Sequence, residues 1–114
     1  MLIDKPNTCP LELLLSQISG PWTLYLLWIL DTNGSLRFGE LRRKVPGIST
    51  KVLTDRLRLL ESMDMIHRHY EPTVPPQVTY TLTELGKELG GSLGELYTFA
   101  MRWHKEEERT SPFH

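Results

Sequence analysis

The residues best suited to chemistry in this chain are basic and hydroxyl side chains at helical spacing near its middle. Lys51, Thr54 and Arg58 follow one another at intervals of three and four residues, which places them on one face of a helix. Lysine and arginine bind phosphate, arginine also pairs with guanine, and threonine contacts phosphate or the methyl group of thymine. The pattern therefore suits contact with DNA.

A helix over about Ser49–Ser62 must position these side chains. Pro46 and Gly47 predict a tight turn before it, and Ser49 or Thr50 can cap its first turn. Its apolar residues gather on the side opposite the polar face; they are Val52, Leu53, Leu57, Leu59, Leu60 and Met63. One side should pack on a core while the other meets a partner, although an ordinary solvated surface is the alternative for such a helix taken alone.

The neighbouring segments follow the order of a winged helix. A short helix over 38–45 precedes the turn at the spacing of a helix-turn-helix. Two segments of β-forming residues, 65–70 and 78–82, flank a proline-rich connection and predict a two-stranded wing over about Ile66–Leu82. The short segment 36–38 could add an edge strand. The predicted fold class is mainly α with a small antiparallel β wing.

The charge distribution also supports a nucleic-acid partner. The whole chain has a net charge of -1. The segment from Arg37 to Tyr70, however, contains eight basic and four acidic residues, which gives a net charge of +4. The positive field is therefore confined to the helix-turn-helix and the first wing strand. The predicted DNA-binding residues are Arg37, with Arg42, Arg43, Lys44 and Arg68 chiefly on the DNA backbone, and Ser49, Thr50, Lys51, Thr54, Asp55 and Arg58 facing the groove.

Two flanking helical regions complete one predicted domain over 1–114. An N-terminal helix within 1–20 opens at Cys9-Pro10, and the winged-helix core over 21–82 begins with a central buried helix. Apolar residues at intervals of three and four predict a long C-terminal helix over 83–109. Its glycines each cost roughly 1 kcal/mol of helix propensity, so we expect a break or a kink near Gly90-Gly91. Its apolar stripe favours dimerisation with a second copy.

An arginine, three aromatic residues and three histidines are expected to have structural roles or no ligand-binding role. Arg56 lies near the apolar side of its helix, so we expect its stem to follow the core and its head to pair with a carboxylate. We expect the aromatic residues Trp22, Tyr25 and Trp28 to lie in the core, with a small effector between them and the last helix as the alternative. His67, His69 and His104 lack a cluster of partners at ligand spacing, so no metal and no cofactor are predicted.

Several functional classes are disfavoured. Cys9 has no histidine and acid partner that the sequence places beside it, and there is no glycine-rich phosphate loop, so the chain is not expected to be an enzyme. The longest apolar run, Leu24–Leu30, has seven residues, which is too short to cross a membrane. The start of the chain lacks a secretion signal and a single cysteine suits a reducing compartment, so we expect a cytoplasmic protein.

The chain resembles the HxlR-type regulators, a branch of the MarR-like winged-helix transcription factors. The matching blocks are Cys9-Pro10, Ile18 through Trp22, Arg37 through Leu41, Pro46 through Ser49, Leu53-Thr54, Arg56 through Arg58 with Leu60-Glu61, and Val74 through Pro76 followed by Tyr80 through Thr83. The resemblance implies a homodimer that places two recognition helices in successive major grooves of a pseudo-palindromic operator. Wings would reach flanking DNA, and the first and last helices would form the dimer interface.

The resemblance also implies a role for Cys9, because a cysteine at this position is the sensor in some HxlR-type members that respond to quinones, diamide or disulfide stress. A helix N-terminus favours the reactive thiolate, and the effector would be a small electrophile or oxidant. A partly buried structural cysteine is the competing interpretation. For the whole chain, the alternative to a DNA-binding regulator is a winged-helix protein-protein interaction module, which would present an apolar or acidic helix face.

Overall fold

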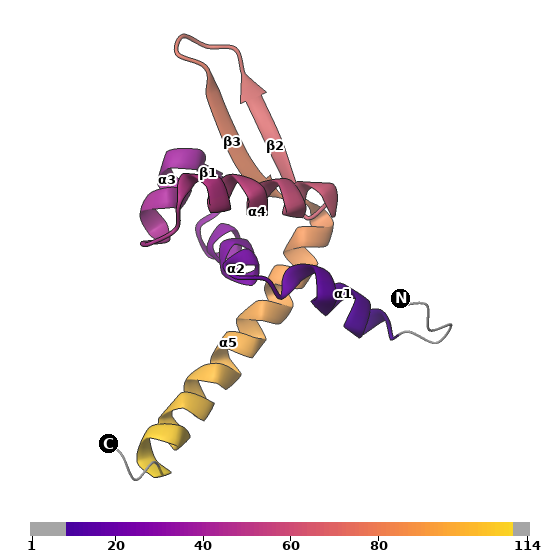
Figure 1. The fold of residues 1–114 in the computed structure, drawn as a ribbon, viewed down its shortest axis with the longest axis vertical. Coiled ribbons are helices and arrows are strands. Elements are labelled where there is room, and N and C mark those ends of the chain that lie inside the picture. The colour runs from indigo at the N-terminus through magenta and orange to yellow at the C-terminus, as the bar shows by residue number, and fades with distance from the viewer. Residues whose placement is uncertain (1–8, 111–114) are drawn as a thin grey trace.

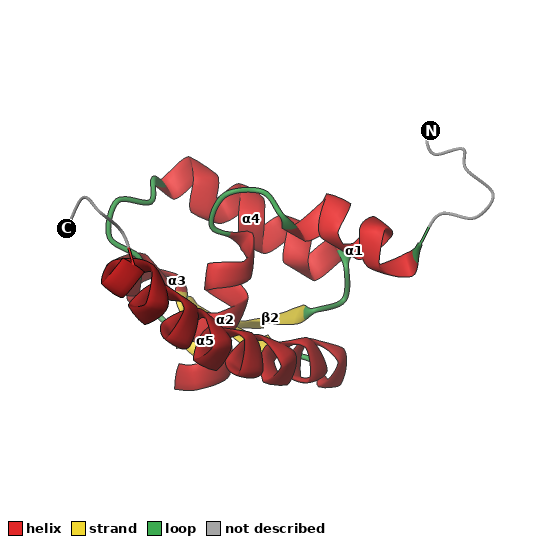
Figure 2. Ribbon diagram, turned by 90° about the horizontal axis from the view of Figure 1, so that it is seen from below, coloured by secondary structure: helices red, strands yellow, loops and turns green. Residues whose placement is uncertain are grey.

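The computed structural model describes residues 9–110 and places helices around a three-stranded antiparallel sheet (Figure 1). The elements in order are α1 (Pro10–Ile18), α2 (Thr23–Asn33), β1 (Leu36–Arg37), α3 (Phe38–Lys44), α4 (Thr50–Ser62), β2 (Ile66–Glu71), β3 (Gln77–Leu82) and α5 (Glu84–Thr110). The predicted fold class is therefore confirmed. The hairpin of β2 and β3 projects from one end and α5 extends from the other, while the view in Figure 2 shows α5 alongside α2.

The sheet ties the wing to the helix-turn-helix. Its strand order is β1-β3-β2, and all pairings are antiparallel. Tyr80 lies at the centre, opposite Leu36 on one side and Arg68 on the other. The expected edge segment therefore forms as β1, although Phe38 belongs to α3 instead. Because β1 leads directly into α3, the wing and the first helix of the helix-turn-helix share one framework.

The core lies between α2, α4 and the sheet. Leu26 and Leu27 of α2 and Leu53 and Leu60 of α4 are fully buried, and each such side chain contributes about 1.5–3 kcal/mol of apolar burial. The predictions of a central buried helix and of an inward apolar side on α4 are confirmed. Tyr25 is different, because it is 43% exposed and stacks at 6.1 Å on Trp28. Its predicted place in the core is wrong.

The last helix is continuous from Glu84 to Thr110, so the predicted break near Gly90-Gly91 is wrong. The reason is close packing. A Cβ at Gly86 would overlap the carbonyl oxygen of Met65, and a Cβ at Gly90 would lie 2.7 Å from Asp31 Oδ1. These glycines let α5 approach the backbone before β2 and the end of α2, and the packing compensates for their low helix propensity.

The turn and cap before α4 form as predicted. Gly47 has a φ of +94°, a left-handed conformation that glycine adopts without steric cost. The backbone N–H of Val52 donates to Ser49 Oγ at 3.1 Å, which satisfies one free donor of the first helical turn. Ser49 is therefore the cap, and the start of α4 is well defined.

Among the described residues, no helix by itself has the length and apolar composition needed to cross a membrane. Only α1 and α2 taken together pass that test, and they are bent by 90° at the break between them.

Candidate nucleic-acid interface

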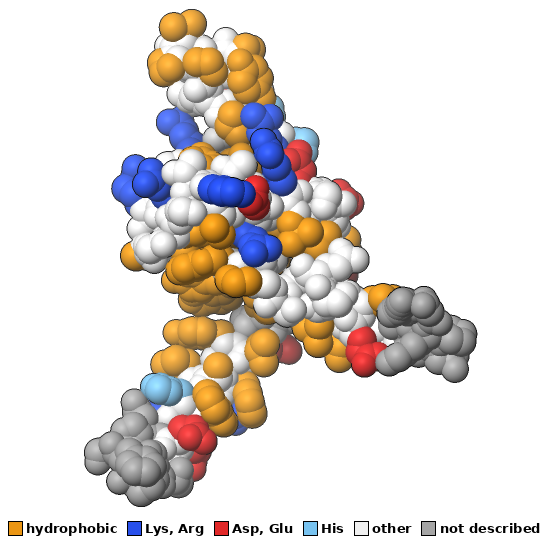
Figure 3. All heavy atoms as spheres, viewed as in Figure 1, with side chains coloured by type: hydrophobic (Ala, Val, Ile, Leu, Met, Phe, Trp, Pro, Cys, Tyr) orange, Lys and Arg blue, Asp and Glu red, His pale blue; other side chains and the backbone are white. Residues whose placement is uncertain are grey.

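Basic side chains gather on the face formed by α3, α4 and the base of the wing (Figure 3). The last turn of α3 carries Arg42, Arg43 and Lys44, all exposed, where the helix dipole favours cations. The start of α3 is held by a hydrogen bond of 2.8 Å from the Arg37 N–H to Glu40 Oε1. The structure thus presents the basic residues predicted before the turn on the surface.

The exposed face of α4 carries an ion pair. Lys51 Nζ lies 3.2 Å from Asp55 Oδ2, and the two side chains are 84% and 51% exposed. Such an exposed pair contributes at most about 1 kcal/mol, so an incoming phosphate can readily replace Asp55 as the partner of Lys51. Ser49 and Thr50 are also exposed at the start of this helix.

Residues from α4 and the wing meet in a cleft of about 390 Å³. Its lining residues are Thr54, Leu57, Arg58, Glu61, Arg68 and Tyr80. The structure therefore brings together three residues predicted to bind DNA, Thr54, Arg58 and Arg68. Sequence analysis missed Glu61, although its spacing from Thr54 and Arg58 places all three on one stripe of the helix. It also missed Tyr80, because no sequence signal indicates which strand residue faces α4.

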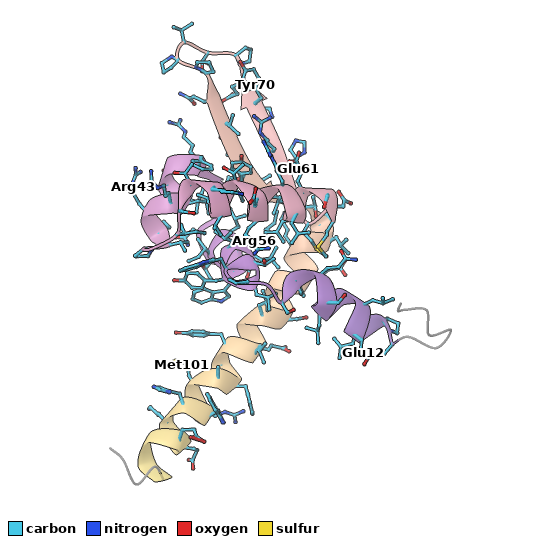
Figure 4. The ribbon with its side chains drawn as sticks, viewed as in Figure 1. Glu12, Arg43, Arg56, Glu61, Tyr70 and Met101 are labelled. Carbon is cyan, nitrogen blue, oxygen red and sulfur yellow. The ribbon has the colours of Figure 1, made fainter. Side chains whose placement is uncertain are left out.

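Arg56 does not make the predicted ion pair. Within residues 9–110, no carboxylate lies within ion-pair distance of its guanidinium, and its Nε is buried without an acceptor. Figure 4 shows Arg56 on the side of α4 away from the wing. Its Nη1 lies 3.2 Å from the place that a Cβ on Gly20 would take. The Arg56 guanidinium therefore lies beside Gly20, in the turn before α2, and not beside a carboxylate.

Cys9 lies at the N-cap position of α1, as predicted, and its side chain is exposed. Its carbonyl oxygen accepts a hydrogen bond of 3.0 Å from the Leu13 N–H. The interpretation of Cys9 as a partly buried residue is therefore wrong. His67 and His69 share a face of β2 with their ring centroids 6.4 Å apart. In the part of the chain that the structure describes, no three His, Cys, Asp or Glu side chains form a group that could hold a metal ion.

Exposed apolar side chains lie on α1 and, separately, along the distal part of α5 (Figure 3). On α1, Leu11, Leu13 and Leu15 are exposed, and on α5 the exposed large apolar residues include Leu96, Tyr97, Phe99, Met101 and Trp103. Between α2 and α5 lies an open apolar groove of about 300 Å³, where Trp28 and Tyr97 stack at 4.9 Å. This surface lies apart from the basic face.

Comparison with known proteins identifies the fold and its function. The family model described as HxlR-like helix-turn-helix matches residues 17–108. The chain belongs to this family. Regulators of the HxlR-like family bind DNA, and this HxlR-like chain is a transcriptional regulator of the helix-turn-helix type, not an enzyme.

The similar proteins are regulators. A helix-turn-helix transcriptional regulator of Methanothermobacter thermautotrophicus is 36% identical over 107 residues, which cover 94% of this HxlR-like chain and 81% of that protein. A MarR-family regulator from Porphyromonas gingivalis has a TM-score of 0.78 and 35% identity, over 85% of this chain and 94% of its own. The redox regulator HypR in its oxidised form has a TM-score of 0.66 and 36% identity, over 86% and 96%.

Proposed function

We propose that this HxlR-like regulator binds a pseudo-palindromic DNA operator as a homodimer, with α4 in the major groove and the wing on flanking DNA. The observation that carries the proposal is the continuity of the basic face. Exposed cations of α3, the polar face of α4 and Arg68 of the wing lie on one side of the molecule. A duplex can contact all three together, because a recognition helix and a wing follow successive grooves.

The residues divide into two roles on this surface. Arg37, Arg42, Arg43, Lys44 and Arg68 hold phosphates and set the register of the protein on the duplex. Ser49, Thr50, Lys51, Thr54, Asp55 and Arg58 face the groove, where Arg58 can pair with guanine and Thr54 with a thymine methyl group. The cationic surface disfavours the alternative of a protein-binding winged helix, which would present an apolar or acidic face.

The homodimer is supported by the apolar surface of α1 and α5. Clusters of exposed large apolar side chains mark an interaction site, and here they include leucines at 43% to 59% exposure on α1 and Trp103 at 56% on α5. A second copy carries the same surface, so a two-fold interface covers both together. A symmetric dimer in turn presents two copies of α4 to a palindromic site.

A redox response through Cys9 is a further part of the proposal. The thiol is exposed at the N-terminus of α1, where a small oxidant or electrophile can reach it. The similar protein HypR is a redox regulator. An oxidant or small electrophile that modifies Cys9 would act beside the proposed dimer surface and alter how the two recognition helices are spaced. A chromosomal partner and a reduced thiol both agree with a cytoplasmic location.

Selection of bound sequences from random duplex DNA tests the function, with purified protein used first reduced and then after mild diamide treatment. Enrichment of an inverted repeat supports a dimeric regulator. Loss of that enrichment after diamide supports the thiol switch, whereas an unchanged repeat retains the regulator and rejects the switch. No enriched sequence would favour the protein-binding module.

The oligomeric state is tested by light scattering on Leu96→Glu. A carboxylate in the apolar groove should convert the dimer to monomers, while Glu95→Lys, a charge change on an exposed residue outside the groove lining, should leave a dimer. A monomeric wild-type chain would contradict this part of the proposal.

A further inference from the structure

We propose that Glu61 is a specificity-determining residue of the DNA interface. Its carboxylate shares a cleft with Arg58 and Arg68 and prevents the two guanidinium groups from holding a phosphate together. The cleft is thereby unfavourable for DNA of arbitrary sequence, so that Arg58 is used for base contact at the operator. This inference rests on the proposed DNA binding and assigns a role to a residue outside the predicted contact set.

The position of Glu61 follows from the geometry of α4. Thr54, Arg58 and Glu61 are separated by four and three residues and therefore lie along one stripe of the helix. All three line the cleft of about 390 Å³, which Arg68 and Tyr80 of the paired strands β2 and β3 complete. Figure 4 shows Glu61 on the side of α4 that faces the wing.

The Glu61 carboxylate lines the same cleft as Arg58 and Arg68 but forms no ion pair with either arginine. Within residues 9–110, no ion pair joins Glu61 to Arg58 or Arg68, whereas on the same helix Lys51 and Asp55 do form one. The cleft thus combines two cations and one anion. A phosphate that enters it is attracted by the arginines and repelled by Glu61.

The location matters because the wing has few cations. Between Ile66 and Leu82, Arg68 is the sole lysine or arginine in the sequence. Electrostatic attraction between the wing and the DNA backbone therefore depends on one side chain at the base of the hairpin. A carboxylate beside that side chain controls most of the wing's affinity for phosphate.

The helix itself does not explain an acidic residue at this position. Glu61 lies in the last turn of α4, where the helix dipole favours cations and disfavours carboxylates. Glu61 is also exposed, so it contributes little apolar burial. A negative charge here acts against the local stability of the helix, which is consistent with a role in binding.

Glu61 should affect non-specific binding and operator binding differently, because the two depend on phosphate contacts to different degrees. Binding to arbitrary sequence depends almost entirely on phosphate contacts, whereas binding to an operator adds contacts to base edges. A residue that weakens phosphate capture by Arg58 and Arg68 lowers non-specific affinity most. In the operator complex Arg58 is occupied by a base, so the same carboxylate has less effect. Glu61 therefore raises the ratio of the two affinities.

The test compares wild type with Glu61→Gln by fluorescence anisotropy, on the selected operator and on a scrambled duplex of equal length, over a series of salt concentrations. We expect affinity for the scrambled duplex to rise about fivefold, with a log-log salt slope steeper by about 0.9, the value for one more neutralised phosphate. Operator affinity should change by less than about twofold, so the specificity ratio falls. Thermal unfolding of both proteins checks that the fold is intact.

Two further variants make the result decisive. Glu88→Gln, at an exposed position of α5 that does not line the cleft, removes the same charge and should leave both affinities unchanged. In an Arg68→Gln background, Glu61→Gln should give less than half of its gain, because its effect acts through that arginine.

Other outcomes would overturn the inference. Identical affinities of Glu61→Gln and Glu88→Gln for both duplexes would show that Glu61 has no special role in DNA binding. Lost affinity for the operator alone would make Glu61 a base-reading residue, since a carboxylate can accept a hydrogen bond from cytosine. Wild-type protein that binds neither duplex would instead contradict the proposed function itself.

Discussion

The Thr83 hydroxyl donates a hydrogen bond of 2.7 Å to the carbonyl oxygen of Asp64, a residue 19 positions earlier in the chain. The Thr83 hydroxyl oxygen itself accepts a hydrogen bond of 3.0 Å from the Gly86 N–H, and the Thr83 N–H donates to the Met65 carbonyl oxygen at 3.0 Å. One side chain therefore joins the end of α4, the base of the wing and the start of α5. The helix α4 and the long last helix α5 are linked at this point.

Thr83→Val should destabilise the chain by about 1–2 kcal/mol, because valine keeps the shape but loses both the cap of α5 and the bond to Asp64. Urea unfolding measures the change. Thr83→Ser, which retains the hydroxyl, should recover most of the stability. Equal stability of the valine variant and wild type would show that the hydroxyl bonds contribute nothing.

The glycines of α5 should respond in opposite directions to alanine. Gly86→Ala should destabilise by about 1–3 kcal/mol, because its Cβ meets the Met65 carbonyl and the backbone must shift. Gly91→Ala adds a Cβ with no atom within 4 Å and should stabilise by about 0.5–1 kcal/mol through helix propensity. Thermal unfolding of the two variants at equal concentration checks this. A tolerated alanine at 86 would contradict the packing of α5 on Met65.

Arg58→Ala should cost about 1–3 kcal/mol in operator affinity and relax the preference at one base pair, if the arginine reads a guanine. Arg43→Ala is the matched variant at the end of α3. It should weaken binding to all duplexes alike and lower the salt slope by about 0.9. Selected sequences and salt titrations measure both. A uniform loss for Arg58→Ala would make it a phosphate contact.

Cys9→Ser should preserve DNA binding under reducing conditions and remove any response to diamide. Serine is a good N-cap residue, whereas the cysteine side chain makes no capping hydrogen bond, so α1 should be as stable or slightly more stable. Anisotropy with and without oxidant is the measurement. A diamide response that persists in the serine variant would exclude Cys9 as the sensor, because the chain has no other cysteine.

The success of the sequence analysis depended on how local each signal is. Ser49 and Gly47 could be assigned because a cap and a left-handed turn involve only neighbouring residues. The glycines of α5 were misjudged because propensity describes an isolated helix, whereas Gly86 and Gly90 contact residues about twenty and sixty positions away. Arg56 was assigned to the correct side of its helix but to the wrong partner, for the same reason.

The sequence by itself determined the order of the elements, the polar face of α4 and the concentration of positive charge between Arg37 and Tyr70. These properties follow from the spacing and the types of the residues, because the periodicity of a helix or a strand determines which side chains share a face. The tertiary structure alone decided that Glu61 and Arg68 share a cleft, that Tyr80 pairs with both Leu36 and Arg68, and that α5 runs unbroken across its glycines. Each of these depends on a contact between distant segments, whose register no local pattern specifies.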